Sequence, residues 1–256
     1  MPTDRKQILI SGAGSGLGRG MAEFLARRGH AILAIDLNEA GAQETAALIK
    51  KAGGQASAHK LDVTSENDVT ALFAKLPAPV DVLVNNAGLQ FMSKLEDYPT
   101  EKWDLLINVM VKGPFLLTRA ALPGMRKQNY GRIVNIGSIH ALVASRFKSA
   151  YTTAKHALIG FTKTIALETA DADITVNTLC PSYIFTPLVE KQIQSQMALN
   201  KMSEAQVRDE IFLKPMPKHA FITSEELAAY TEFLMSHHAR NITGQSLAID
   251  GGWTVQ

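Results

Sequence analysis

Cysteine is nearly absent from this chain of 256 residues, because Cys180 is the only one. A single cysteine excludes a disulfide framework within the chain and a cysteine-rich metal site, and we interpret Cys180 as a buried thiol. The seven histidines include the adjacent pair His237 and His238, but they lack the His-Glu-x-x-His spacing of a zinc site. The sequence therefore predicts no bound metal.

An excess of charge of one sign and long hydrophobic runs are lacking as well. The formal net charge is +2, and the 26 basic and 24 acidic residues are interspersed, so there is no basic stripe typical of nucleic-acid-binding proteins. No apolar run approaches the ~20 residues of a membrane span, and the polar start MPTDRKQILI is too short for a secretory signal. We therefore expect no nucleic-acid partner, no membrane association and a cytoplasmic location.

The chain does have enough hydrophobic residues, 46%, to bury a sizeable core as one α/β domain over 1–256. Strand-like and helix-like patterns alternate, which predicts a doubly wound parallel sheet with helices on both faces and ligands at the carboxyl ends of the strands. The segment 186–218 is polar and rich in Met and Gln, and we expect it to form a helical, mobile lid. Strands are predicted at 7–11, 30–36, 55–62, 80–88, 131–136, 174–180 and 246–250. Helices are predicted at 21–29, 39–52, 66–76, 100–128, 149–170 and 224–236. The helix at 100–128 is expected to be interrupted around Gly113-Pro114.

A glycine-rich turn follows the first predicted strand. Gly12, Gly16 and Gly18 have Gly-x3-Gly-x-Gly spacing and precede a helical pattern. Glycines let the backbone approach a pyrophosphate, and the following helix offers free N–H groups and the positive end of its dipole. This context predicts a dinucleotide-binding turn.

Acidic residues end the next two predicted strands. Asp36 can accept hydrogen bonds from both hydroxyls of an adenosine ribose and repels the additional phosphate of NADP, so it favours NAD. The alternative is a solvated carboxylate at the end of the strand, or a helix cap. Asp62 and Val63 lie where the carboxyl end of a strand can meet the adenine.

The stretch from Asn135 to Lys155 contains a possible acid–base device. Tyr151 and Lys155 are four residues apart, so in a helix the phenol and the ammonium lie on one face, and Ser138 comes shortly before them. A free phenol titrates near ~10, and an ammonium nearby stabilises its anion and lowers that pKa. Ser138 then holds a carbonyl or alcohol oxygen beside the phenol. An ordinary amphipathic helix is the alternative for this pattern taken alone.

These motifs together resemble those of the short-chain dehydrogenases/reductases over the full chain. The resemblance is carried by the glycine turn, Asn85-Asn86-Ala87-Gly88, Ser138, Tyr151-x3-Lys155 and Asp250-Gly251-Gly252. It implies a Rossmann-type fold, a homotetramer and NAD(P)-dependent interconversion of an alcohol and a ketone. Tyr is the acid/base in that family, Lys lowers its pKa and holds the nicotinamide ribose, and Ser polarises the substrate oxygen. The cofactor-site residues expected here are Gly12, Ser15, Gly16, Leu17, Gly18, Asp36, Asp62, Val63, Asn86, Ala87, Gly88, Tyr151, Lys155, Pro181 and Thr186.

A finer resemblance, to the bacterial D-3-hydroxybutyrate dehydrogenases, is carried by the stretches YPTEKWD, LVASRFKSAY, TPLVEKQI and DGGWT. It implies NAD-dependent interconversion of D-3-hydroxybutyrate and acetoacetate, in ketone body metabolism. A cation and amide donors suit a substrate carboxylate. The alternatives are a solvated loop lysine at 148 and a terminal core or interface aromatic at 253. The substrate-site residues that the resemblance implies, beside Ser138 and Tyr151, are Gln90, His140, Lys148, Gln192 and Trp253.

Two positions depart from the family pattern. Met110 stands where the family has an Asn that helps to hold a water in the proton relay, and Asn108 lies roughly 200° away around a helix at ~100° per residue. Ser182 replaces the Gly of a Pro-Gly pair, where a Cβ can crowd the nicotinamide or conflict with a glycine-only conformation. Two alternatives therefore stay open: a dehydrogenase of another small hydroxy acid or polyol, and a catalytically weak NAD-binding protein.

Overall fold

The computed structural model describes residues 5–255, apart from the side chains at 187, 188, 191, 195 and 199. Within these residues, seven parallel strands form one sheet in the order β3-β2-β1-β4-β5-β6-β7. Strands β2 and β3 are added on one side of β1, and strands β4 to β7 on the other side. The change of side between β1 and β4 is the point at which a doubly wound sheet forms a crevice for ligands. The strands are β1 (Gln7–Ser11), β2 (Ala31–Asp36), β3 (Gln55–Lys60), β4 (Val82–Asn85), β5 (Gly131–Ile136), β6 (Ile174–Pro181) and β7 (Ser246–Ile249).

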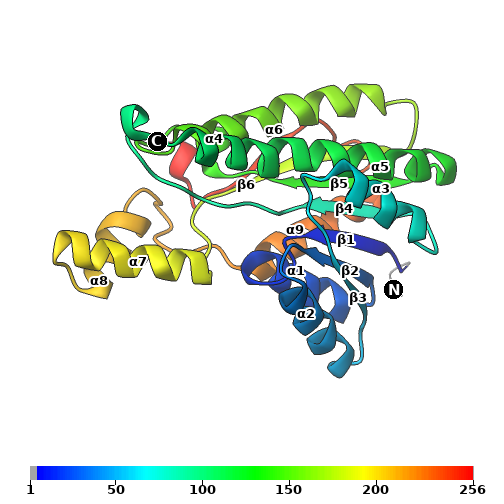
Figure 1. Cartoon of the computed structure of the whole chain (residues 1–256), viewed down its shortest axis with the longest axis horizontal. Coiled ribbons are helices and arrows are strands. Elements are labelled where there is room, and N and C mark those ends of the chain that lie inside the picture. The colour runs from blue at the N-terminus through cyan, green and yellow to red at the C-terminus, as the bar shows by residue number, and fades with distance from the viewer. Residues whose placement is uncertain (1–4, 256) are drawn as a thin grey trace.

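Helices cover both faces of the sheet (Figure 1), which confirms the predicted Rossmann-type α/β fold. One face carries α1 (Gly16–Arg27), α2 (Glu39–Lys51) and α9 (Ser224–Met235). The other face carries α3 (Glu66–Lys75), α4 (Thr100–Ile107), α5 (Gly113–Gln128) and α6 (Ser149–Glu168). The predicted third strand was too long, because β3 ends at Lys60 and Asp62 lies in the turn that follows.

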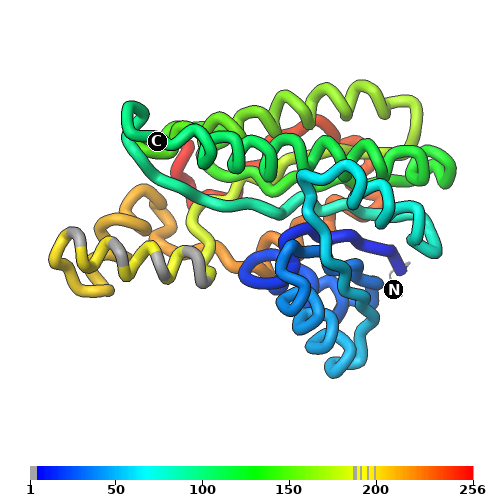
Figure 2. Tube along the Cα trace, viewed as in Figure 1, coloured from blue at the N-terminus to red at the C-terminus, as the bar shows by residue number. Residues whose placement is uncertain are grey.

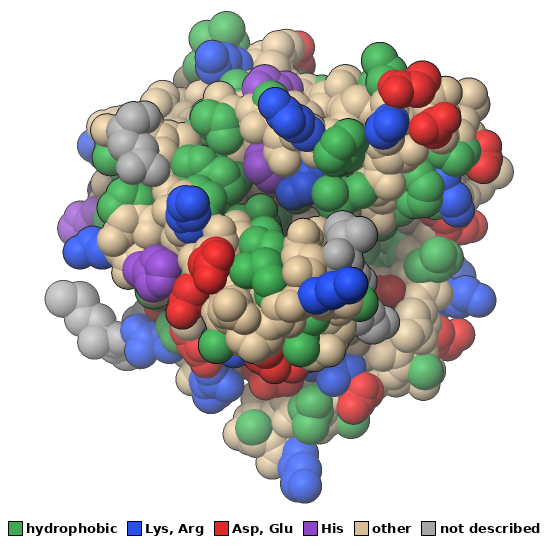
Figure 3. All heavy atoms as spheres, turned by 90° about the vertical axis from the view of Figure 1, so that its left-hand side faces the viewer, with side chains coloured by type: hydrophobic (Ala, Val, Ile, Leu, Met, Phe, Trp, Pro, Cys, Tyr) green, Lys and Arg blue, Asp and Glu red, His purple; other side chains and the backbone are tan. Residues whose placement is uncertain are grey.

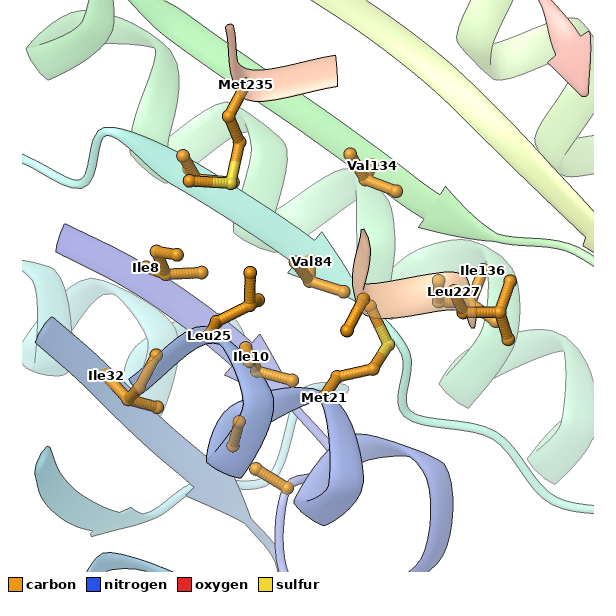
Figure 4. Packing of buried hydrophobic residues seen from close by; sticks show 14 of the residues in the cluster. Ile8, Ile10, Met21, Leu25, Ile32, Val84, Val134, Ile136, Leu227 and Met235 are labelled. Carbon is orange, nitrogen blue, oxygen red and sulfur yellow. The ribbon is translucent and has the colours of Figure 1, made fainter. Parts of the chain in front are cut away.

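Hydrophobic cores fill the space on each side of the sheet. Successive side chains of a strand point to opposite faces. Ile8 and Ile10 of β1 therefore pack with Met21 and Leu25 of α1, as Figure 4 shows, whereas Leu9 packs against the helices of the other face. A strand that is buried on both faces reads as a continuous apolar run, which is why β1 was predictable from the sequence.

The stretch Thr100–Gln128 is one continuous helical rod in which the π-helical segment Asn108–Lys112 joins α4 to α5. The interruption expected around Gly113-Pro114 is a change of helix type and not a break, because the π-helical segment ends directly before Gly113 and the rod continues through Pro114. Among the described residues, this is the one helix long and apolar enough to cross a membrane. Leu106 and Leu117 are 0% and 1% exposed, and their packing is that of a core helix of a globular domain.

The lid, as we name residues 186–218, contains α7 (Pro187–Asn200), α8 (Glu204–Gln206) and the π-helical turn Val207–Leu213. It projects from the body of the molecule (Figures 1 and 2), and its helical structure confirms the prediction. Its side chains form a small core of their own, in which Val189, Ile193, Val207 and Phe212 are buried. The lid therefore stands as a packed unit beside the carboxyl ends of the strands, and its mobility remains a prediction.

Candidate active site

A cavity of about 740 Å³ opens at the carboxyl ends of the strands, between the body and the lid. It is lined by every residue expected at the cofactor site, and by Gln90, Ser138, His140, Lys148 and Gln192 from the expected substrate site. Figure 3 looks onto the side of the molecule that carries the lid and shows a hollow there with hydrophobic side chains on its walls. The fold thus brings together residues from positions 12 to 192 of the chain.

The glycine turn forms one end of this cavity. Gly12 and Gly16 have φ values of 67° and 52°, which L side chains rarely adopt, and a Cβ on Gly12 would lie 3.0 Å from the Cα of Ala87. Ser15 precedes α1 without a side-chain capping hydrogen bond, and the first turn of α1 contains no acidic residue. The first N–H groups of α1 therefore remain available to an anion, and the turn fits a pyrophosphate.

Asp36 lines the cavity next to the glycine turn. Its Oδ2 accepts a hydrogen bond from the Gly14 N–H and its Oδ1 accepts one from the Asn38 N–H, each at 2.8 Å. The cap of α2 is Asn38, whose side chain accepts from the Gly41 N–H, so the helix-cap alternative for Asp36 is wrong. Each carboxylate oxygen can accept a further hydrogen bond, which leaves Asp36 suited to two ribose hydroxyls.

The serine, tyrosine and lysine of the expected acid–base device lie together. Tyr151 and Lys155 share one face of α6, with the Lys155 Nζ 5.5 Å from the centroid of the Tyr151 ring. Lys155 is 4% exposed and donates to the carbonyl oxygen of Ile136, at the end of β5, over 2.6 Å. Ser138 follows the same strand end, and its hydroxyl is hydrogen-bonded to the Tyr151 phenol. This arrangement can hold an alcohol or carbonyl oxygen and exchange a proton with it.

Burial shifts the pKa values of Tyr151 and Lys155. Burial raises the pKa of Tyr151 and outweighs the hydrogen bond from Ser138, which lowers it. Burial also lowers the pKa of Lys155 to about 8, against the opposing effect of Cys180. Burial disfavours the charged form of each group, and the expected lowering of the Tyr151 pKa by Lys155 remains a prediction. Cys180 is a buried thiol, as expected, and burial raises its pKa to about 11.

A buried basic pair lies beside the serine and the tyrosine. The Lys148 Nζ is 3.1 Å from the His140 Nε2, and the two residues are 6% and 3% exposed. Burial lowers the pKa of Lys148, and burial together with the Lys148 charge lowers the pKa of His140 to about 4. The alternative of a solvated loop lysine at 148 is thus wrong. Gln90 and Gln192 line the same cavity, and the buried Oε1 of Gln90 has no hydrogen-bond partner among the described residues.

Comparisons with known proteins assign the chain to a family. The family model described as short chain dehydrogenase matches residues 6–197. The chain belongs to the short-chain dehydrogenase family. Its relatives include two proteins named D-beta-hydroxybutyrate dehydrogenase. The protein of Rhizobium meliloti (strain 1021) is 43% identical, over 98% of this chain and 99% of the relative's length. The protein of Cupriavidus necator is 38% identical, over 98% of this chain and 98% of the relative's length. An NAD-dependent glycerol dehydrogenase of Listeria innocua is 32% identical over 98% of this chain and 94% of its own.

Trp253 of this short-chain dehydrogenase is not among the residues that line the cavity, and its expected contact with the substrate remains a prediction. Its ring centroid lies 6.0 Å from that of His140 and 5.7 Å from that of Tyr183, because the turn at Gly251-Gly252 directs the indole behind these two rings. Tyr183 lines the cavity instead, and the Lys148 Nζ lies 5.7 Å from its ring centroid. The motifs did not single out Tyr183; its place between Pro181-Ser182 and the lid was the available signal.

The two departures from the family pattern are accommodated in the core of this short-chain dehydrogenase. Met110 is 1% exposed and packs with Leu106 and with α6, whereas Asn108 is exposed and does not take its place, as expected. Ser182 does not have a positive φ, so its backbone does not require glycine. Its hydroxyl is directed to the Met216 Sδ at 2.8 Å, in a buried contact between the segment that leads into the lid and the end of the lid.

Proposed function

We propose that this short-chain dehydrogenase interconverts D-3-hydroxybutyrate and acetoacetate with NAD. The observation that carries the proposal is the buried pair of Lys148 and His140 beside Ser138 and Tyr151. Lys148 is 6% exposed, and within 5–255 no carboxylate lies within ion-pair distance of it. A buried ammonium requires compensation by an anion, and a substrate carboxylate supplies one. The relatives named D-beta-hydroxybutyrate dehydrogenase support the same substrate.

In the proposed reaction, Lys148 and His140 bind the substrate carboxylate, and the amides of Gln90 and Gln192 contribute further hydrogen bonds. The substrate oxygen lies between the Ser138 hydroxyl and the Tyr151 phenol. Bound NAD supplies the hydride acceptor in the oxidation.

In the oxidation, the phenolate form of Tyr151 accepts the hydroxyl proton and becomes the phenol; in the reduction, the phenol donates that proton and becomes the phenolate, while Ser138 holds the reacting oxygen. Lys155 is held by the end of β5 on the same face of α6 and binds the cofactor ribose beside the phenol. Because burial raises the pKa of Tyr151, the neutral phenol predominates at neutral pH, which suits reduction. We therefore expect oxidation to accelerate as the pH rises.

The preference for NAD rests on Asp36. Its carboxylate lies at the end of β2 and faces the cavity, where a 2′-phosphate would bring a second negative charge close to it. The glycine turn and the uncapped start of α1 supply the phosphate end of the same site. NADP should therefore bind far more weakly than NAD.

Assembly as a homotetramer in the cytoplasm also belongs to the proposal. Leu105 and Phe115 on the rod of α4 and α5 are 43% and 42% exposed, and burial of such side chains between identical copies is a common way to cover them. The mass in solution, measured by light scattering, tests the assembly, and a monomer at micromolar concentration would contradict it. The expected partner is a small hydroxy or oxo acid, with neither nucleic acid nor membrane.

The proposal is tested by following NADH absorbance with each enantiomer of 3-hydroxybutyrate, with NAD and NADP in parallel. Turnover of the D enantiomer with NAD is expected. Tyr151→Phe should abolish that turnover but leave the affinity for NAD unchanged. Full turnover by the Tyr151→Phe protein would overturn the assigned chemistry.

Two rival functions are separated by the same assay. A polyol dehydrogenase, suggested by the glycerol dehydrogenase of Listeria innocua, would oxidise glycerol and would not lose activity in Lys148→Ala. A catalytically weak NAD-binding protein, suggested by Met110 in place of the family's Asn, would bind NAD tightly and turn over no carboxylate-bearing alcohol. Loss of activity that is confined to carboxylate substrates in Lys148→Ala would support the hydroxybutyrate assignment.

A further inference from the structure

The turn after β7 is organised by one carboxylate. Asp250 is 8% exposed, and its Oδ1 accepts a hydrogen bond from the Gly252 N–H at 2.9 Å. Its Oδ2 accepts from the Thr254 N–H at 2.9 Å and from the Thr254 hydroxyl at 2.7 Å. Gly251 and Gly252 have φ values of 62° and 91°, so the backbone reverses tightly around this carboxylate. Hydrogen bonds to an ionised acceptor are among the stronger ones, and three of them fix the turn.

The turn carries Trp253 to the back of the substrate site. The indole contacts the rings of His140 and Tyr183, and both of these residues line the cavity while Trp253 does not. His140 also contacts the Tyr151 ring, with centroids 6.2 Å apart. Any displacement of Trp253 therefore removes the support behind the two rings nearest to Lys148.

The same turn rests on the end of the lid. The Lys218 N–H donates to the carbonyl oxygen of Gly251 at 2.9 Å, and a Cβ on Gly251 would lie 3.3 Å from the Cβ of Met216. Met216 in turn receives the Ser182 hydroxyl from the segment that leads into the lid. The turn is thus held between the sheet and the end of the lid.

We propose that Asp250 is a positioning residue for substrate binding, which seats Trp253 against His140 and Tyr183 and thereby fixes the wall that faces the substrate carboxylate. This inference rests on the proposed function, because it concerns the same substrate site. Asp250 touches neither the substrate site nor the cofactor end of the cavity, so it acts only through the rings that Trp253 supports.

The test uses Trp253 as its own reporter. The sequence has two tryptophans, so a Trp103→Phe background leaves Trp253 as the only one. In that background, Asp250→Asn should shift the emission of Trp253 to longer wavelength and raise its quenching by acrylamide. The KM for D-3-hydroxybutyrate should rise about tenfold, the effect of ~1.4 kcal/mol, with kcat and the affinity for NAD nearly unchanged.

A milder variant and a matched control guard against misfolding. Thr254→Val removes one hydroxyl donor to Asp250 and should change emission and KM in the same direction by a smaller amount. Thr164→Val makes the same chemical change on the exposed side of α6, where the hydroxyl donates to the Gly160 carbonyl oxygen, and should change neither quantity.

A third readout needs no turnover. Burial holds the pKa of His140 at about 4, and its charged neighbours Lys148 and His156 are unchanged in Asp250→Asn. Loosening the wall admits water and should raise this pKa toward 6.5, as measured by NMR. A folded Asp250→Asn protein with unchanged Trp253 emission and an unchanged His140 pKa would overturn the inference. If the wild type fails to oxidise hydroxybutyrate, the proposed function fails, while emission and the His140 pKa still decide the role of Asp250.

Discussion

Replacing Lys148 by methionine should weaken substrate binding and leave the fold intact. Lys148 is 6% exposed, and its ammonium lies 3.1 Å from the His140 Nε2. Burial lowers its pKa, so the folded protein carries the cost of desolvating this charge. Methionine is similar in length, unbranched and uncharged, so it fills the same space and removes that cost.

We expect a large effect of this substitution on catalysis and a small effect on stability. Removing one partner of a buried charge pair costs about 2–5 kcal/mol, so kcat/KM for D-3-hydroxybutyrate should fall by about 30-fold to 4,000-fold. Activity toward 2-butanol, which has no carboxylate, should not fall. The free energy of unfolding should change by less than about 1 kcal/mol, because relief of the buried charge offsets the loss of the hydrogen bond to the His140 Nε2.

Steady-state kinetics on both alcohols and urea unfolding measure these quantities, with Lys163→Met on the exposed side of α6 as the matched control. Equal losses toward both alcohols would refute the reasoning that Lys148 binds a carboxylate. So would a loss of more than about 2 kcal/mol in the free energy of unfolding, because it would show that Lys148 serves the fold instead.

Further predictions concern the cofactor end, the lid and pH. Asp36→Ser should reduce the ratio of NADP to NAD dissociation constants, and an unchanged ratio in titrations would contradict the assigned role. Ser182→Gly loses the contact with Met216 and should lower the free energy of unfolding by about 1 kcal/mol. Urea unfolding measures this quantity, and an increase in the free energy of unfolding would contradict the prediction. Because the folded pKa of His140, about 4, lies below its unfolded value of 6.5, about 3 kcal/mol of stability should be lost as the pH falls from 6.5 to 4. His140→Gln should flatten this part of the stability profile, and an unchanged profile would exclude His140 as its cause.

The fold and the cofactor end were predictable because their signals are local. Ile8 to Ile10 form an apolar run that ends in glycines, and both the strand and the turn follow from that pattern. Asp36 was placed correctly because parallel strands bring their carboxyl ends to one edge of the sheet. These features require only the neighbours in sequence and the handedness of strand–helix–strand units.

The parts that were not predictable depend on contacts between distant segments. The pKa of Tyr151 is governed by burial, which the spacing to Lys155 does not report. Trp253 lies behind His140 because of a turn fixed by Asp250 and by the end of the lid. The sequence indicated an irregularity around Gly113-Pro114, but not that it would be a π-helical segment at 108–112.

The separate core of the lid has a consequence for how this protein can change over time. Val189, Ile193, Val207 and Phe212 pack with one another, apart from the cores that support β1 and the glycine turn. Substitutions within this small core can therefore reshape the lid without repacking the cores that hold β1 and the glycine turn. The side of the cavity on which Gln192 lies can thus vary through natural mutation while Ser138, Tyr151 and Lys155 stay in place on the body.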